Sequence, residues 1–232
     1  MAAKIKNGLL NWKYYLSSPV HIIYFLISLV ILLFAAKYCK TYIAEFTQRP
    51  GMLLHDPLLA QFRPHDFSNI IFVLFHLGIV LCFASFYDDP RGLSVAFQAY
   101  ALLMLFRTIT IFLWPLQAPV DMIFLQDPFA EVYMHQNGHR VVNDLFFSGH
   151  VSSSFLFFIV AKGKYTKRIL LFITVTVAIM ILWQKVHYTI DVLAAPFFSL
   201  LAVKSVSFIN AKVHAAWVPP IEVIRQEEVI SA

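Results

Sequence analysis

The sequence Asn143-Asp-Leu-Phe-Phe-Ser-Gly-His150, separated by two apolar segments from His187-Tyr-Thr-Ile-Asp191, carries the strongest prediction about how this chain folds. Each motif stands at the beginning of an apolar run, where a membrane-spanning helix would begin. Ionisable side chains at the edge of such a helix need partners and usually serve a function. We therefore expect the rest of the chain to build a helix bundle that brings the two motifs together at one end.

The composition agrees with a membrane protein. Hydrophobic residues make up 59% of the chain and charged residues 13%, with a mean hydropathy of +0.71, whereas a soluble domain has about 25% charged residues. A chain of 232 residues holds about six spans of roughly 20 residues each and no additional soluble domain. The prediction is an all-α polytopic protein, a six-transmembrane helix bundle over residues 20–210, with an interfacial segment at 1–19 and a tail at 211–232. The predicted spans are residues 21–42, 68–87, 93–114, 146–161, 169–183 and 188–208.

The net charge of +5 does not indicate nucleic-acid binding, because the basic residues lie in short loops between spans. Such residues orient helices, and the side richer in lysine and arginine lies inside. The densest group, Lys162 to Arg168, predicts that both termini lie inside and that the two motifs lie at the outer face. The location expected is a bacterial inner membrane with a periplasmic site, or a Golgi or plasma membrane in a eukaryote.

His187 and Asp191 are four residues apart, so on a helix they share one face. The aspartate can then fix the tautomer of the histidine, leaving the other ring nitrogen as a base or nucleophile. The alternative is a structural hydrogen bond between the two side chains. The second motif favours the functional interpretation, because it supplies groups that such a base would need.

Ser148, Gly149 and His150 fit the first turn of a helix that binds an anion. Serine is a preferred N-cap, glycine lets a ligand approach the backbone, and the N–H groups of a helix N-terminus attract phosphate. His150 would supply a proton beside this phosphate position. Two histidines then have separate roles, one attacking phosphorus and the other protonating the departing oxygen.

Three further charged residues are candidate substrate-binding groups, namely Arg107, Asp144 and Lys185. Arg107 lies inside a predicted span, about 10 Å from its end at the standard rise of a helix. A cation there faces the bundle interior and pairs with an anion, either a substrate phosphate or a carboxylate such as Asp144 or Asp191.

The long connector over residues 115–146 contains His135 and His139. If this segment were helical, the two imidazoles would share a face and could bind a metal ion. A metal-dependent enzyme that uses them together with His150 and His187 therefore remains one alternative.

Phe147-Ser-Gly-His150 and His187-Tyr-Thr-Ile-Asp191 together resemble the type 2 phosphatidic acid phosphatase superfamily, and most of all its sphingomyelin synthase branch. The resemblance is specific over residues 143–198, weaker at Arg107 with Thr110, and suggestive at Asp56. It implies six spans, no metal cofactor and a phosphohistidine intermediate. By position it implies His187 as nucleophile, Asp191 as the residue that orients it, and His150 as acid and then base.

The chain departs from the lipid phosphatases of this superfamily at two phosphate-binding motifs. Tyr42 stands where Lys precedes Arg49-Pro50, and Met180-Ile181 replaces Ser-Arg. A phosphate monoester carries two charges and needs more cations than a diester. The prediction is therefore a phosphotransferase that moves a headgroup from a phospholipid to ceramide or diacylglycerol. The alternatives are a phosphatase or phospholipase C-like hydrolase using the same triad, and a non-catalytic lipid-binding or scaffold protein.

Overall fold

The computed structural model describes residues 2–46, 49–125 and 145–217, and these residues form helices and loops without a β-strand. The prediction of an all-α protein is confirmed for this part of the chain. In chain order the elements are α1 (Ala2–Ser17), α2 (Pro19–Phe46), the short 3₁₀ helix η1 (Leu59–Gln61), α3 (Ser68–Ala84), α4 (Pro90–Leu113), α6 (Gly149–Val160), α7 (Lys164–Trp183) and α8 (Thr189–Trp217).

Four of these helices are long and apolar enough to cross a membrane, which indicates an integral membrane protein. They are α2, α4, α7 and α8, over Pro19–Ile43, Pro90–Leu113, Lys164–Trp183 and Thr189–Lys212. Helices α3 and α6 are also apolar but shorter than the roughly 20 residues that a bilayer requires. The structure thus has an apolar helix in each of the six predicted positions, while the number that cross the membrane stays a prediction.

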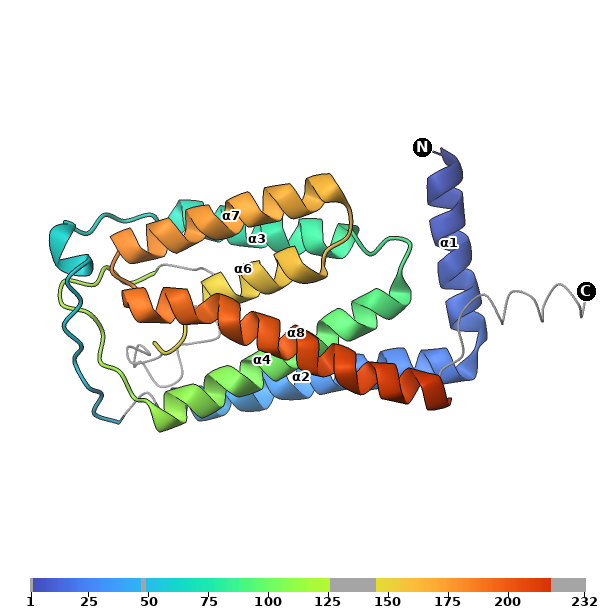
Figure 1. Ribbon diagram of the computed structural model, residues 1–232, viewed down its shortest axis with the longest axis horizontal. Coiled ribbons are helices and arrows are strands. Elements are labelled where there is room, and N and C mark those ends of the chain that lie inside the picture. Colours follow the sequence, from blue (N-terminus) through green and yellow to red (C-terminus); the bar gives the residue numbers. More distant parts are fainter. Residues whose placement is uncertain (1, 47–48, 126–144, 218–232) are drawn as a thin grey trace, which may run out of the picture.

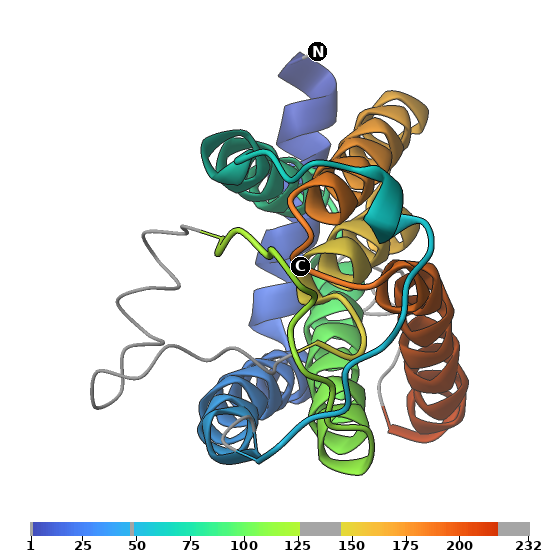
Figure 2. The same cartoon turned by 90° about the vertical axis from the view of Figure 1, so that its left-hand side faces the viewer.

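The apolar helices form a bundle with α6 at its centre, where α6 packs against α3, α4, α7 and α8. Figure 1 shows α3, α6 and α7 on one side and α2, α4 and α8 on the other. The bundle has a loop end, formed by residues 49–67, 114–125 and 184–188, and a turn end, formed by residues 85–89 and 161–163. Figure 2 views the bundle from the loop end, where the segments after α2 and α4 cross the ends of the helices.

At the turn end, side chains fix the connections between helices. Asp89 accepts a hydrogen bond from the Gly92 N–H at 2.9 Å, which caps α4. The same carboxylate lies 2.7 Å from Lys162 Nζ, and Ser85 Oγ accepts the Lys162 N–H at 3.1 Å. The turn between α6 and α7 is thereby joined to the turn between α3 and α4. This holds α6 in a defined position along the bundle axis.

Helix α1 lies crosswise at the turn end in Figure 1. Asn11 Nδ2 donates to the Asp88 carbonyl and Trp12 Nε1 to the Tyr87 carbonyl, both at 3.0 Å. This arrangement suits the interfacial segment predicted at residues 1–19. At the other terminus, α8 continues to Trp217 and so includes the beginning of the predicted tail.

Polar side chains form a chain of hydrogen bonds between α2, α4 and α8. Tyr24 donates to Asn210 Oδ1 at 3.0 Å, Asn210 donates to Gln98 Oε1 at 2.8 Å, and Gln98 donates to Ser28 Oγ at 2.7 Å. The hydrophobic effect does not drive helix association inside a membrane, where the lipid is equally apolar. These bonds therefore specify how α2 docks on the bundle.

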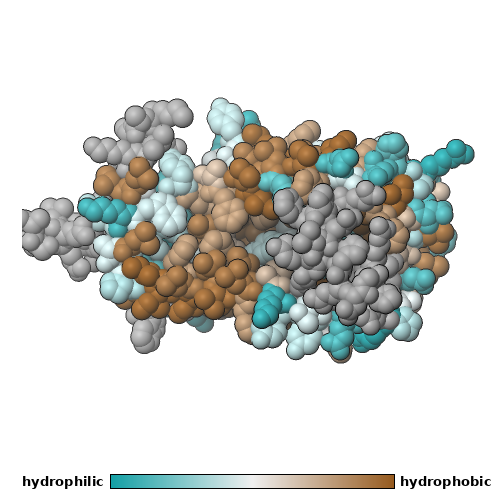
Figure 3. Space-filling model, turned by 180° about the vertical axis from the view of Figure 1, so that it is seen from behind, coloured by the Kyte–Doolittle hydropathy of each residue, from teal (hydrophilic) through white to brown (hydrophobic). Residues whose placement is uncertain are grey.

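The outer surface of the helices is apolar, as a lipid-facing surface should be. In Figure 3 hydrophobic side chains cover the middle of one face, and hydrophilic ones gather toward the loop end. In the bundle interior, the central helix places Val151, Leu156 and Phe157 in a buried core. The site described next lies where this core meets the loop end.

Candidate active site

The first turn of α6 has the geometry expected for an anion site. Ser148 is the N-cap, and its hydroxyl accepts the Val151 N–H. Gly149 is the first helical residue and His150 the second. The His150 ring packs edge-on against Phe75 of α3, with 4.8 Å between the ring centroids. The predicted motif therefore opens a helix whose N-terminus carries partial positive charge.

Arg107 reaches this helix N-terminus from α4. Its Nη1 donates a hydrogen bond to the Phe147 carbonyl. A Cβ added to Gly149 would lie 3.1 Å from Arg107 Cζ, so the guanidinium packs directly over the glycine. A side chain at position 149 would displace it. The structure thus brings Arg107 together with Ser148 and Gly149, and supplies a physical reason for the glycine.

Thr110, one turn beyond Arg107 on α4, contacts the same segment. Its hydroxyl lies 3.0 Å from the Phe146 carbonyl and 2.9 Å from the Arg107 carbonyl, within hydrogen-bonding distance of both. Arg107 and Thr110 therefore bond to consecutive carbonyls before α6. They fix the segment that leads into the anion site.

His187 and Asp191 form a buried pair, with His187 Nδ1 3.5 Å from Asp191 Oδ2. The expectation that both lie on one helical face is wrong for His187, because α8 begins at Thr189. The carboxylate instead turns back and accepts the Tyr188 N–H at 3.0 Å. Within the described part of the chain, His187 Nδ1 and Asp191 Oδ1 have no hydrogen-bond partner. A small rotation of the imidazole would convert this close approach into a hydrogen bond, as is common before substrate binds.

The two motifs meet through their backbones. The Ser148 N–H donates a hydrogen bond of 3.2 Å to the Asp191 carbonyl. This bond places the first turn of α6, with Gly149 and His150, beside the first turn of α8. The N-terminus of α6 and the Arg107 guanidinium therefore face the same region, which favours an anion.

Asp56, in the loop after α2, caps the N-terminus of α8. Its Oδ2 accepts the Thr189 N–H at 2.7 Å, and its Oδ1 accepts the Thr189 hydroxyl at 3.1 Å. Burial raises the pKa of Asp56, but the hydrogen bonds from Thr189, Leu59 and Leu58 outweigh burial and hold that pKa below its ordinary value. The aspartate is therefore ionised at neutral pH. It fixes the residues that immediately follow His187.

Tyr188 and Gln184 hold the loops over the end of the bundle. The Tyr188 hydroxyl donates to the Gln117 carbonyl at 2.9 Å and accepts the Leu54 N–H at 3.3 Å. Gln184, which is fully buried, accepts the Phe67 N–H at 3.0 Å and donates to Ser68 Oγ at 2.9 Å. Both residues flank His187, so the loop that carries it is fixed on both sides.

Of the remaining candidate residues, Lys185 is the one that the structure describes. Lys185 is buried, has a φ of 57°, and lines a cavity of about 300 Å³ with Tyr188, His55 and Asp56. Asp144, His135 and His139 fall outside the described residues. Among the residues that the structure does describe, no group of three or more His, Cys, Asp or Glu side chains could hold a metal ion.

Two residues that support the site carry only a weak signal in the sequence. Asp56 was a suggestive match only, although an aspartate before a proline in a loop is a common cap or turn residue. Gln184 was not singled out, although an amide at the end of an apolar run needs buried partners. The hydrogen-bond partners of these two residues could not be found from residue spacing. Asp56 and Thr189, for example, are 133 positions apart.

The arrangement has the parts of a site for phosphoryl transfer. A buried imidazole lies against a carboxylate, and a second imidazole stands on a helix whose N-terminus also faces a guanidinium. Such a site binds a phosphate group by charge and offers one ring nitrogen for attack and another for proton transfer.

One comparison with known proteins gives a match. Residues 142–207 match the family described as PAP2 superfamily C-terminal, whose members are generally phosphatases or phosphotransferases. The matched segment contains both motifs and the hairpin of α6 and α7 between them. No curated protein and no solved structure matches the chain.

Proposed function

We propose that this chain, whose residues 142–207 match a family model of the type 2 phosphatidic acid phosphatase superfamily, is a lipid headgroup phosphotransferase. It moves a phosphate-bearing headgroup from a phospholipid to ceramide or diacylglycerol, as a sphingomyelin synthase does. His187, Asp191 and His150 carry the reaction, and Arg107, Ser148 and Gly149 bind the phosphate. Asp144 and Lys185 are proposed to contact the substrate.

The observation that carries this proposal is the junction between the first turns of α6 and α8. The Ser148 N–H donates to the Asp191 carbonyl at 3.2 Å, and Arg107 packs over Gly149, the residue after Ser148. A phosphate bound at the N-terminus of α6 would thus be adjacent to the segment that carries His187. Charge-assisted hydrogen bonds from a guanidinium orient a phosphate well.

In the first proposed step, His187 attacks the phosphorus of the donor lipid. Its Nδ1 faces Asp191, so Nε2 is the attacking nitrogen. A bond forms from Nε2 to phosphorus while the bond from phosphorus to the diacylglycerol oxygen breaks. His150 gives its proton to that oxygen, and diacylglycerol leaves. Asp191 stabilises the positive charge on the phosphohistidine.

In the second step, the neutral His150 removes the proton from the hydroxyl of the acceptor lipid. The acceptor oxygen attacks phosphorus, the bond from phosphorus to Nε2 breaks, and His187 is regenerated. His150 regains the proton that it donated in the first step. The headgroup has then moved from one lipid to another without any net change in protons.

The choice of transfer over monoester hydrolysis follows from the cations near the site. Arg49, the arginine that follows Tyr42 in the altered phosphatase motif, donates from Nη2 to the Phe112 carbonyl at 3.3 Å. Its guanidinium also lies 4.7 Å from the Phe112 ring centroid. This arginine is thus engaged with the end of α4, and a singly charged diester needs fewer cations than a monoester. The alternative function is hydrolysis by the same triad with water as acceptor.

The test is to follow a labelled headgroup in liposomes containing the purified protein. Phosphatidylcholine, phosphatidylethanolamine and phosphatidylglycerol, each labelled in the headgroup, serve as donors, with ceramide and diacylglycerol as acceptors. We expect label on the acceptor lipid, lost in His187→Ala and retained in the control His65→Ala, which changes an exposed histidine of the loop end. Label released only into water would establish the hydrolase instead. No turnover of any donor by the native chain would refute both.

A further inference from the structure

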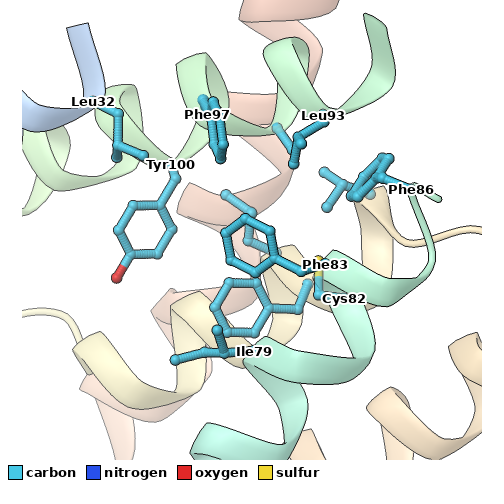
Figure 4. A pocket seen from close by; sticks show the side chains of 12 residues that line it. Leu32, Ile79, Cys82, Phe83, Phe86, Leu93, Phe97 and Tyr100 are labelled. Atoms are coloured by element: carbon cyan, nitrogen blue, oxygen red, sulfur yellow. The ribbon is translucent and has the colours of Figure 1, made fainter. Parts of the chain in front are cut away.

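A second feature of the bundle lies toward the turn end, away from the two motifs. It is a cavity of about 150 Å³ between α2, α3, α4 and α6. Its lining is almost wholly apolar and includes Ile79, Cys82, Ala96, Phe97, Leu156 and Phe157. Figure 4 shows the side chains of α3 and α4 converging on this space. We propose that this cavity binds the distal part of one hydrocarbon chain of the substrate lipid and so selects lipids by chain length.

Continuity with the site is the first reason for this assignment. Helix α6 begins at the anion site with Gly149 and reaches the cavity at Leu156, about 10 Å further at the standard rise. Phe75 connects the two regions: its ring contacts His150 at 4.8 Å and Phe157 at 6.0 Å between centroids. Ile79, one turn after Phe75 on α3, lines the cavity. A chain whose headgroup lies at the site would follow α6 into this space.

Two hydroxyl groups lie close together at the end of the cavity nearer the site. The Tyr100 hydroxyl lies 3.5 Å from Ser153 Oγ, one turn after Gly149 on α6, while the Tyr100 ring stacks on Phe157. The polar residues of α6 end at Ser154, and only apolar residues follow from Phe155 to Val160. This change from polar to apolar matches a lipid whose polar part is at the site and whose chain lies beyond it.

The size of the cavity sets how much of the chain it holds. A dry apolar cavity of comparable volume in another protein takes a benzene molecule. This one would therefore hold about six carbon atoms, the end of a chain rather than the whole of it. The chain leaves a lipid phase that is equally apolar, so selection comes from the dispersion contacts that the chain gains with the close-packed cavity lining. Chains long enough to enter should thus react faster than chains that stop short.

This inference rests on the proposed function, and the first experiment separates the two. Donor lipids with dihexanoyl, dioctanoyl, didecanoyl and dipalmitoyl chains are compared at one surface fraction in mixed micelles. Ala96→Phe fills the cavity from α4, and Phe83→Ala enlarges it from α3. The control is Val175→Phe, which adds the same ring on the exposed face of α7. Dividing each variant's rate by the wild-type rate on the same lipid removes differences in lipid presentation.

We expect Ala96→Phe to retain its rate on dihexanoyl donors and to lose tenfold or more on dipalmitoyl donors. Phe83→Ala should shift the preference toward longer chains, and Val175→Phe should leave the profile unchanged. Equal ratios on all chain lengths in both cavity variants would overturn the inference while leaving the transferase proposal intact. Absence of turnover on every chain length in the native protein would instead refute the proposed function.

A binding measurement tests the cavity without turnover. Phosphatidylcholine with a diazirine at the chain terminus is photolysed with the native protein and with Arg107→Ala, and the labelled peptides are sequenced. We expect labelling around Ile79 to Cys82 and Leu156 to Val160, reduced in Arg107→Ala because the headgroup is no longer held. Labelling that ignores Arg107, or that misses both segments, would show that the cavity holds bulk membrane lipid or nothing, and would overturn the inference.

Discussion

The carboxylate of Asp56 accepts hydrogen bonds from both the backbone N–H and the hydroxyl of Thr189, at 2.7 and 3.1 Å. One loop residue after α2 thereby fixes the beginning of α8, directly after His187. The bond joins segments far apart in the chain and determines where the candidate nucleophile stands.

Replacing Asp56 with alanine should therefore lower both stability and activity. Loss of an N-cap lowers the free energy of unfolding by about 1–2 kcal/mol, and His187 loses its support. Asp89→Ala is the matched control, because Asp89 caps α4 at the turn end through the Gly92 N–H at 2.9 Å. The unfolding temperature in detergent should fall in both variants, whereas kcat should fall only in Asp56→Ala. An equal loss of kcat in both would show that Asp56 acts through general stability.

The pH dependence of this cap follows from the lowered pKa of Asp56. A carboxylate with a lowered folded-state pKa stabilises the fold above its ordinary value, here 3.8. That stabilisation is lost as the pH falls below 3.8 toward the folded-state pKa. The difference in unfolding temperature between the native chain and Asp56→Ala should thus be constant from neutral pH to about 5 and decrease below about 4. A difference that already disappears at pH 6 would contradict this assignment.

A second prediction concerns Asp191. Asp191→Asn keeps an oxygen that can accept the Tyr188 N–H but removes the charge beside His187. By analogy with other triads we expect kcat to fall by roughly 10³–10⁴. The circular dichroism spectrum should be unchanged, which separates chemistry from folding. A variant with near-native kcat would assign the pair a structural role only.

A third prediction concerns the space that Gly149 leaves for Arg107. In Gly149→Ala the new methyl group would lie 3.1 Å from Arg107 Cζ and push the guanidinium away. We expect kcat/KM to fall by about ten- to a hundredfold, the range produced by a small misplacement of a binding group. Gly78→Ala is the control, since its nearest neighbour would be at 3.7 Å, an ordinary contact. If both variants keep full activity, the packing of Arg107 over Gly149 has no bearing on catalysis.

A fourth prediction concerns the polar chain that docks α2. Tyr24→Phe and Asn210→Ala each remove one member of the Tyr24–Asn210 bond. Hydrogen bonds between membrane helices contribute about 0.6 kcal/mol on average and at most about 1.7. A double-mutant cycle on the free energy of unfolding in mixed micelles should give a coupling free energy in this range. The kcat on the donor lipid should be nearly unchanged. Strict additivity of the two variants would mean that the bond does not stabilise α2.

Several features could be predicted from the chain because their causes are local. Apolar runs and their flanking charges predicted the helical class, and each predicted span overlaps an observed apolar helix. Serine before glycine predicted the start of α6, since capping depends on neighbouring residues only. The two motifs also predicted the superfamily, which the match at residues 142–207 supports.

What the sequence could not give was the set of partners that hold the site in place. Spacing suggested a helical His187, but tertiary contacts begin α8 at Thr189 and fold the Asp191 carboxylate back. Asp56 and Gln184 reach their partners across more than a hundred residues, and such pairs leave no periodic signal.

The sequence by itself determined the chemistry available to this protein: two histidines, an aspartate and an arginine at the edges of apolar helices. Only the tertiary structure decided their geometry. Arg107 lies over Gly149, and the first turns of α6 and α8 meet through one backbone hydrogen bond. The physical reason is that local preferences decide where a helix begins, whereas packing and long-range hydrogen bonds decide which helix ends meet.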